Sequence, residues 1–320
     1  MKIIVNIIKL LIIKIIPEWV LGELMSVFPK LKDKKFTELY QTKKIFKNAP
    51  ETPVWLGWNE LESLNQKYPL PPSYGYDPQS LEDRGEERAE EILSLISTKT
   101  EKTNTFLELG NWDGMVSCSL QRRGKKTTAI DNRSEGFDRR AVSEGVVLLE
   151  MDAAHLQFEN ESFDFVFSYD GFEHFSEPEM VLQEAIRVVK RGGYIYLSFG
   201  DLYMSPHGLH IYDTIPVPYV HYLFSKELLK DFVKAKGLKP FSFERDDIVA
   251  YTPLNGWPIE DFRSLWDNYS HKLEKINYHE SNTLSDLDLI QKYPSCFKSK
   301  TKLFDNLITS SIKVLFKKIQ

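Results

Sequence analysis

The sequence predicts an α/β protein in which helices cover both faces of a mostly parallel, doubly wound sheet. Between residues 77 and 237, short apolar runs of strand length alternate with longer segments that carry helix caps. Acidic residues and glycines stand where several of these runs end, which is where an open α/β sheet binds its ligands. At 320 residues, with 42% hydrophobic and 27% charged residues, the chain is long enough for one large domain or two small ones.

The expected elements follow one another in a regular order. The first helix, over 77–96, has Asp77 as its N-cap and Pro78 at its first position, and the last has Ser225 as N-cap and Gly237 as C-cap. In chain order, the expected strands are 105–110, 126–131, 146–153, 162–170 and 192–200, and the expected helices are 77–96, 112–123, 133–145, 178–190 and 225–237. A further helix starts at Pro258.

Residues 1–77 are expected to form an amphipathic helix and a mostly helical cap segment. Lys2, Asn6 and Lys9 fall on one face of a helix over 1–16, and Ile and Leu fill most of the remainder. Such a helix is about 24 Å long, shorter than the roughly 30 Å hydrocarbon core of a membrane. Lysines also interrupt the apolar run, which argues against a secretory signal. The helix is expected to lie on a membrane surface, to pack on its own domain, or to close a homodimer.

Charge is distributed unevenly along the chain. The net charge of −5 does not suit a nucleic-acid-binding protein. Residues 1–50 carry a net +6, residues 51–100 a net −6 and residues 298–320 a net +5. Basic ends beside apolar residues suggest contact with anionic lipid headgroups, although scattered lysines also serve solubility. The two cysteines exclude a disulfide framework and favour a reducing compartment, so we expect a cytoplasmic protein.

The strongest functional signal is a glycine turn followed by an acid. Glu108, Gly110 and Gly114 end the first expected strand and open the next helix, a geometry that brings main-chain N–H groups close to a ligand. Asp131 ends the next strand, about 20 residues later, where an acid suits a pair of ribose hydroxyls. This order of features predicts a nucleoside-containing cofactor.

Three further features carry a resemblance to a known family. Asp152 and Ala153 follow the third strand, where a carboxylate and a main-chain group can bind an adenine edge. Residues 163–174 read FDFVFSYDGFEH, and residues 187–199 read RVVKRGGYIYLSF. With the glycine turn, these motifs resemble the class I S-adenosylmethionine-dependent methyltransferases, within them the methyltransferase type 11-like group, over roughly residues 80–255.

The resemblance implies a seven-stranded Rossmann-like sheet that ends in an antiparallel hairpin. Residues 272–281 and 308–319 are assigned to its last two strands, although the periodicity of the second segment also permits an amphipathic helix. The expected domains are the N-terminal segment over 1–77 and a methyltransferase domain over 78–320. An insertion over 201–224 is expected to lie over the acceptor site.

The resemblance also implies roles for individual residues. The cofactor S-adenosylmethionine is expected to contact Glu108, Gly110 and Gly114 at its methionine end, Asp131 at the ribose, Asp152 and Ala153 at the adenine, and Ser168 and Tyr169 near the sulfonium. One departure stands out, because Trp112 replaces the middle glycine of the family's first motif. A side chain there has to turn aside or cap the pocket.

A hydroxyl acceptor has to lose a proton, and histidine is the natural base near neutral pH. His210, His207 and His174 are the candidates, with Asp213 expected to orient His210. His207 and His210 lack a recognisable third ligand, so no metal site is expected.

We therefore expect an S-adenosylmethionine-dependent methyltransferase that acts on a small molecule or glycan, most readily by O-methylation. One alternative is an inactive cofactor-binding scaffold, which Trp112 keeps open. The other is a nicotinamide-dependent oxidoreductase, which is expected to show a Gly-x-Gly-x-x-Gly turn and a Tyr-x-x-x-Lys or similar hydride-site base; the glycine motif is absent here.

Overall fold

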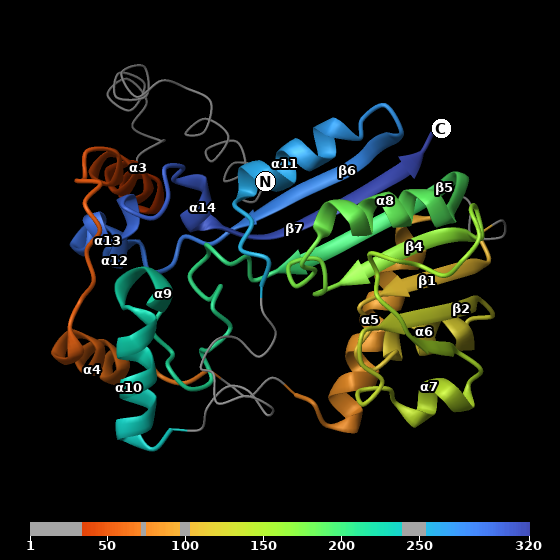
Figure 1. Ribbon diagram of the computed structural model, residues 1–320, viewed down its shortest axis with the longest axis horizontal. Coiled ribbons are helices and arrows are strands. Elements are labelled where there is room, and N and C mark those ends of the chain that lie inside the picture. The colour runs from red at the N-terminus through yellow and green to blue at the C-terminus, as the bar shows by residue number, and fades with distance from the viewer. Residues whose placement is uncertain (1–33, 72–74, 97–102, 239–253) are drawn as a thin grey trace.

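The computed structural model describes residues 34–71, 75–96, 103–238 and 254–320. Its centre is one seven-stranded mixed sheet in the order β3-β2-β1-β4-β5-β7-β6 (Figure 1). The parallel strands are β1 (Thr105–Leu109), β2 (Lys126–Asp131), β3 (Val147–Glu150), β4 (Phe163–Tyr169) and β5 (Val189–Gly200). The predicted α/β class with a doubly wound sheet is confirmed.

The strand order reverses between β1 and β4, which are hydrogen-bonded neighbours although β2 and β3 separate them in the chain. The carboxyl ends of β1, β2, β3, β4 and β5 therefore meet along one edge of the sheet, with a switch point between β1 and β4. We call this the carboxyl edge. Ligands of open α/β sheets bind at such an edge.

The chain ends in the expected antiparallel hairpin. β6 (Leu273–Asn282) pairs with β7 (Thr309–Lys318), and β7 pairs with β5 from Tyr194↔Lys317 to Gly200↔Ser311. The last segment is therefore a strand, and the amphipathic helix that its periodicity also permitted is not formed. Pairing with the buried strand β5 decides the outcome, since Ile312, Val314 and Phe316 all become buried.

Helices cover both faces of the sheet. α5 (Pro78–Leu95), α6 (Met115–Arg122) and α7 (Arg139–Ser143) pack on one face, and α8 (Pro178–Val188) and α11 (Ile259–Asn268) pack on the other. Asp77 caps α5 by accepting hydrogen bonds from the N–H groups of Gln79 and Ser80, as predicted. Ser225 and Gly237 cap α10 (Lys226–Lys236), also as predicted.

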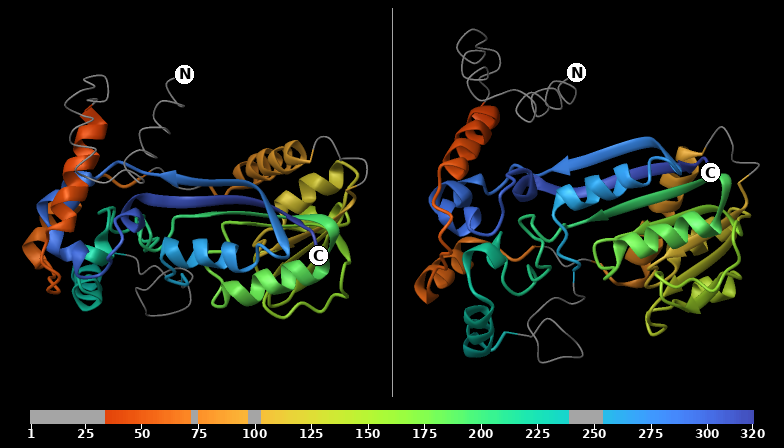
Figure 2. Two further views of the ribbon diagram at one scale, coloured as in Figure 1. Left: turned by 90° about the horizontal axis from the view of Figure 1, so that it is seen from above. Right: turned by 45° about the horizontal axis from the view of Figure 1, so that its top comes forward.

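A second hydrophobic core lies beyond the carboxyl edge, on the side where the arrow of β5 ends (Figures 1 and 2). We call the helices around it the helical lobe. They are α3 (Lys34–Lys47), α4 (Trp58–Lys67), α9 (Val220–Leu223), α10, α12 (Leu287–Lys292), α13 (Pro294–Lys298) and α14 (Asp305–Ile308). This core combines three separate stretches of sequence, so the lobe is not built from the N-terminal segment alone.

Two kinds of sequence prediction differ from the structure or fall outside it. α6 starts at Met115 rather than residue 112, because the glycine turn occupies the preceding residues, and β5 starts at Val189 rather than residue 192. The predicted helix over 1–16 lies outside the described residues. Within the part of the chain that is described, no helix is both long and apolar enough to cross a membrane.

Candidate active site

The turn after β1 needs its glycines. Gly110 and Gly114 both have left-handed backbone conformations, with φ of +68° and +78°. A Cβ on Gly110 would lie 3.2 Å from the Phe175 ring, and one on Gly114 would lie 2.9 Å from Leu148. The Gly110 N–H donates to the Ile130 carbonyl at the end of β2, which ties the turn to the neighbouring strand.

Glu108 supports this turn from below. Its carboxyl group is fully buried and accepts hydrogen bonds from the Ser117 hydroxyl (2.6 Å) and the Ser117 N–H (3.2 Å) on α6. Burial raises the pKa of Glu108 to about 8, against the opposing effect of Ser117. In this structure Glu108 therefore joins β1 to α6, and it shapes the turn through that link.

The Trp112 side chain points away from the glycine turn in which the residue lies. Its backbone is left-handed with φ +48°, and its side chain is 42% exposed. The indole packs against Gly136, where a Cβ would come within 3.0 Å of the ring, and the Arg133 guanidinium lies 5.2 Å from the ring centroid. The sequence allowed this side chain either to turn aside or to cap the pocket. It turns aside, toward the loop between β2 and α7.

Asp131 stands at the end of β2, beside the turn. Its Oδ2 accepts the Trp112 N–H at 3.0 Å, and its Oδ1 accepts the Arg133 N–H at 3.2 Å. Burial raises its pKa above the ordinary aspartate value, while these N–H donors oppose that effect. Each carboxylate oxygen has a second lone pair, so the carboxylate can still accept hydrogen bonds from a pair of hydroxyls.

The other residues expected to contact cofactor are placed less uniformly. Asp152 follows β3 with its side chain 64% exposed, accepts the Ala154 N–H and approaches His155, and both contacts lower its pKa. The next residue, Ala153, is buried. Both lie at the carboxyl edge, where they were expected.

Ser168 and Tyr169 point to opposite faces of the sheet. The Ser168 hydroxyl is buried and donates to the Leu109 carbonyl at 2.8 Å, under the glycine turn. The Tyr169 hydroxyl lies within hydrogen-bond distance of Glu91 (3.0 Å) and of the Arg88 carbonyl (3.2 Å) on α5, and the Arg88 guanidinium lies 4.8 Å from its ring centroid. The Tyr169 side chain is therefore held against α5.

Two of the three candidate histidines lie side by side. The rings of His174, after β4, and His210, in the insertion, are 5.3 Å apart in a nearly perpendicular arrangement. His210 Nε2 is 2.9 Å from the Asp201 main-chain carbonyl. His207 instead faces Tyr212, with 5.8 Å between ring centroids.

The expected pairing of His210 with Asp213 is wrong in this structure. Asp213 is exposed, and the ring of His210 is held by the Asp201 carbonyl instead. Successive turns over 202–210 bring His210 back to the carbonyl of Asp201, the residue directly after β5. Asp213 is nearer to His210 in the sequence, but it does not hold the ring.

Sequence reasoning passed over two acids at this edge. Glu173 is buried directly before His174, and Asp201 follows β5; burial raises the pKa of both carboxyl groups. Glu173 lies in the motif over 163–174, so its position was visible, but its burial was not. Among the described residues, no group of three His, Cys, Asp or Glu side chains is arranged to hold a metal ion.

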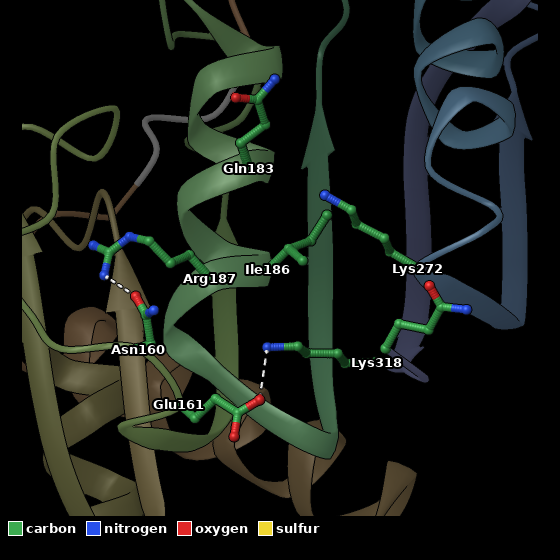
Figure 3. A pocket seen from close by; sticks show the side chains of 8 residues that line it. Asn160, Glu161, Gln183, Ile186, Arg187, Lys272 and Lys318 are labelled. Carbon is green, nitrogen blue, oxygen red and sulfur yellow. Dashed lines mark hydrogen bonds and ion pairs between the residues drawn. The ribbon is translucent and has the colours of Figure 1, made fainter.

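A cavity of about 340 Å³ lies elsewhere, at the opposite edge of the sheet (Figure 3). Its lining includes Lys272, Lys318, Arg187 and Glu161. The Lys318 ammonium donates hydrogen bonds to the Val189 carbonyl and to Glu161. None of the glycine-turn residues, acids or histidines at the carboxyl edge lines this cavity. The chemistry is therefore assigned to the carboxyl edge.

The side chains at the carboxyl edge fit S-adenosylmethionine. Asp131 retains acceptor capacity for the ribose hydroxyls, and Gly110 and Gly114 add no side chains of their own to the turn, although the Phe175 ring packs against Gly110. Trp112, the residue most at odds with such a ligand, leans away over Gly136.

The chain is similar in sequence to known methyltransferases. Residues 107–197 match a family model described as "Methyltransferase domain". A demethylmenaquinone methyltransferase of Clavibacter sepedonicus is 26% identical over 55% of this chain and 78% of its own length. A ubiquinone biosynthesis O-methyltransferase of Cupriavidus pinatubonensis is 25% identical over 45% of this chain and 70% of its own length.

A solved structure is also similar to this chain. A SAM-dependent methyltransferase from Methanosarcina mazei aligns at 15% identity and a TM-score of 0.43, over 70% of this chain and 97% of that chain. The family match includes most of β1, the glycine turn, Asp131, the whole motif over 163–174 and most of β5. Residues 107–197 therefore carry a methyltransferase domain, and the chain is an enzyme that uses S-adenosylmethionine as its methyl donor.

Proposed function

We propose that this methyltransferase transfers the methyl group to a hydroxyl oxygen of a small organic acceptor, with His210 as the general base. The observation that carries the proposal is the packed pair of His174 and His210 at the carboxyl edge, with His210 Nε2 held 2.9 Å from the Asp201 carbonyl. A hydroxyl acceptor needs a base of this kind, because its oxygen is a weak nucleophile while it keeps its proton.

The contact with Asp201 supports one tautomer of His210. A carbonyl oxygen only accepts hydrogen bonds, so Nε2 has to carry the proton in this arrangement. In the neutral ring Nδ1 then holds the free lone pair. Nδ1 is therefore the atom that would take the proton from the acceptor hydroxyl.

S-adenosylmethionine supplies an electrophilic methyl group on a positively charged sulfur, so positioning accounts for much of the catalysis. Asp131 would orient the ribose, and the glycine turn would hold the methionine end. Asp152 and Ala153 would contact the adenine. Ser168 shapes the floor through its hydrogen bond to the Leu109 carbonyl.

The relatives support a class of acceptor. Two of them are named for the methylation of demethylmenaquinone and for an O-methylation in ubiquinone biosynthesis, at 26% and 25% identity. Their names favour a quinone-type ring compound over a sugar as the acceptor here. The O-methyltransferase among them favours oxygen over nitrogen as the atom that receives the methyl group.

The test is a methyl-transfer assay with labelled S-adenosylmethionine and a panel of quinol, catechol, amine and sugar acceptors. His210→Ala should lower turnover on the active hydroxyl acceptor by roughly 10²–10⁴ while cofactor affinity is unchanged. His207→Ala is the matched control, because its ring faces Tyr212 rather than His174. Near-normal turnover of His210→Ala would remove His210 as the base, and transfer only to amines would overturn O-methylation.

We also propose peripheral contact with anionic membranes through residues 1–16, on the sequence pattern alone. The basic segment over 298–320 is not included, because four of its six lysines are held by partners within the protein. Lys300 donates to the carbonyls of Val54, Tyr222 and Cys296, and Lys318 donates to the Val189 carbonyl.

A further inference from the structure

A buried acid stands next to the histidine pair and has no role in the steps above. The Glu173 side chain is 1% exposed, and its Oε1 accepts the Gly200 N–H at 3.2 Å. Its Oε2 is buried and has no hydrogen-bond partner among the described residues. Burying a carboxyl group with one oxygen unsatisfied costs free energy, so its presence calls for an explanation.

The main chain from Gly200 to Asp201 connects Glu173 with His210. Gly200 is the last residue of β5, and the carbonyl of the next residue, Asp201, lies 2.9 Å from His210 Nε2. On the far side of this segment, the Leu202 N–H donates to the Ser310 carbonyl beside β7 at 2.9 Å. The segment over 200–202 is thus held from β7 on one side and by the Glu173 carboxyl group on the other.

From this geometry we infer that Glu173 is a positioning residue for the methyl transfer. By accepting the Gly200 N–H, it fixes the Asp201 carbonyl, which in turn fixes the orientation and tautomer of His210. The inference rests on the proposed role of His210 as the base. Because the Glu173 side chain is buried, we assign it no direct contact with the acceptor or the cofactor.

The carboxyl group performs this task in its neutral form. Burial, followed by the nearby charges of Asp170 and Asp201, raises the pKa of Glu173 well above the ordinary value. A neutral carboxylic acid accepts the Gly200 N–H through its carbonyl oxygen, as a glutamine amide would. Glutamine at position 173 should therefore keep the hydrogen bond from the Gly200 N–H, whereas an apolar residue of similar size should lose it.

The main chain at this position is fixed independently of the side chain. The Asn255 N–H donates to the Glu173 carbonyl at 2.8 Å, and the Asn255 side-chain amide donates to the Phe172 carbonyl at 2.9 Å. A change of the Glu173 side chain therefore leaves these anchors in place. Its effect should concentrate on the segment over 200–202.

The experiment compares Glu173→Gln with Glu173→Met in the full chain. Glu173→Met should lower turnover on a hydroxyl acceptor by about 10², the scale of a 1 Å displacement of a catalytic group, with cofactor affinity unchanged. Glu173→Gln should stay within about threefold of the wild type, as befits a neutral acid replaced by an amide. Glu177→Gln and Glu177→Met, at an exposed acid on the same loop, are the matched controls.

The pH profile separates positioning from general structural damage. The acidic limb of kcat/KM should differ between Glu173→Met and Glu173→Gln, because only Glu173→Met loses the acceptor that holds the segment carrying the Asp201 carbonyl. The other titratable groups around His210 are His174 after β4, His207 and Asp201 on the insertion, and His221 on α9. They are the same in both variants, so the difference between Glu173→Gln and Glu173→Met belongs to position 173.

Nitrogen NMR of the His210 ring gives a readout that needs no acceptor. The wild type and Glu173→Gln should show the proton on Nε2, and Glu173→Met should show a mixture of tautomers. An unchanged tautomer in folded Glu173→Met, or equal loss of turnover in both variants, would overturn the positioning role. If Glu173→Met does not fold, Glu173→Leu takes its place. Normal turnover of His210→Ala would instead overturn only the assignment of His210 as the base. The tautomer measurement would still test whether Glu173 orients the His210 ring.

Discussion

The Trp112 N–H donates a hydrogen bond to Oδ2 of Asp131 across 3.0 Å, so the residue that departs from the family's glycine motif also holds the acid expected to bind the ribose. The main chain of the turn performs this task, and the indole has no part in it. A large side chain is tolerated because it leans over Gly136, under the Arg133 guanidinium. The feature that favoured an inactive scaffold thus leaves Asp131 oriented.

Asp131→Ala should weaken S-adenosylmethionine binding by about 1.5–3 kcal/mol, the contribution of hydrogen bonds to a charged group. Because burial raises the pKa of Asp131, wild-type affinity should also fall as the pH drops toward that raised value, whereas the variant should show less pH dependence. Calorimetry at several pH values measures both effects. Asp152→Ala is the comparison, since its exposed carboxylate should contribute less. Unchanged affinity in a folded Asp131→Ala protein would exclude this residue from the site.

Trp112→Gly should bind the cofactor at least as tightly as the wild type. Glycine adopts the left-handed conformation at φ +48° without the penalty that a side chain brings, and the main-chain donor to Asp131 is retained. Isothermal titration of the two proteins decides the matter. A loss of tenfold or more in affinity would show that the indole itself contacts the ligand, contrary to its position beside Gly136.

Glu108→Gln should flatten the pH dependence of stability. Burial raises the folded-state pKa of Glu108 to about 8, above the unfolded value of 4.5. Between these values the unfolded state loses its proton more readily, so the free energy of unfolding should fall as the pH rises, by up to about 1.4 kcal/mol per unit. Below pH 4.5 this contribution is constant, and above pH 8 the full penalty is present. Glutamine cannot ionise and should remove that slope.

Urea titrations of the two proteins at pH 5, 6, 7 and 8 measure this difference. The gap between Glu108→Gln and the wild type should widen in favour of the variant as the pH rises. A constant gap would mean that the folded-state pKa of Glu108 is not raised. Other buried acids, Glu173 among them, contribute equally to both proteins and cancel in the comparison.

The sequence predicted those features that local order determines. The glycine turn, Asp131 and the strand ends follow from a strand, a turn, a helix and an acid in succession, and the structure places them together at one edge. The partner of His210 could not be predicted in this way. It is the main-chain carbonyl of Asp201, and carbonyls are present at every residue, so no pattern of side chains indicates which one is used.

The helical lobe shows the same limit on a larger scale. Its core joins Phe46 on α3, Tyr219 before α9 and Phe297 on α13, which come from three distant stretches of the chain. Apolar periodicity predicts that each helix buries a face, but it does not say against which partner. The burial of Glu173 is non-local in the same sense, because its neighbours Gly200 and Asn255 come from other elements.

The last prediction concerns residues 1–16. Full-length protein should float with vesicles that contain anionic lipid, and less protein should float at high salt, because basic residues near such a surface contribute about 1 kcal/mol each and salt screens them. A chain that starts at residue 17 should remain at the bottom of the gradient. Replacing Lys300 and Lys318 should not change flotation, since both ammonium groups are bound to carbonyls within the protein. If the full-length protein does not float and the shortened chain is insoluble, residues 1–16 cover the protein's own surface or a second subunit, and the membrane proposal is wrong.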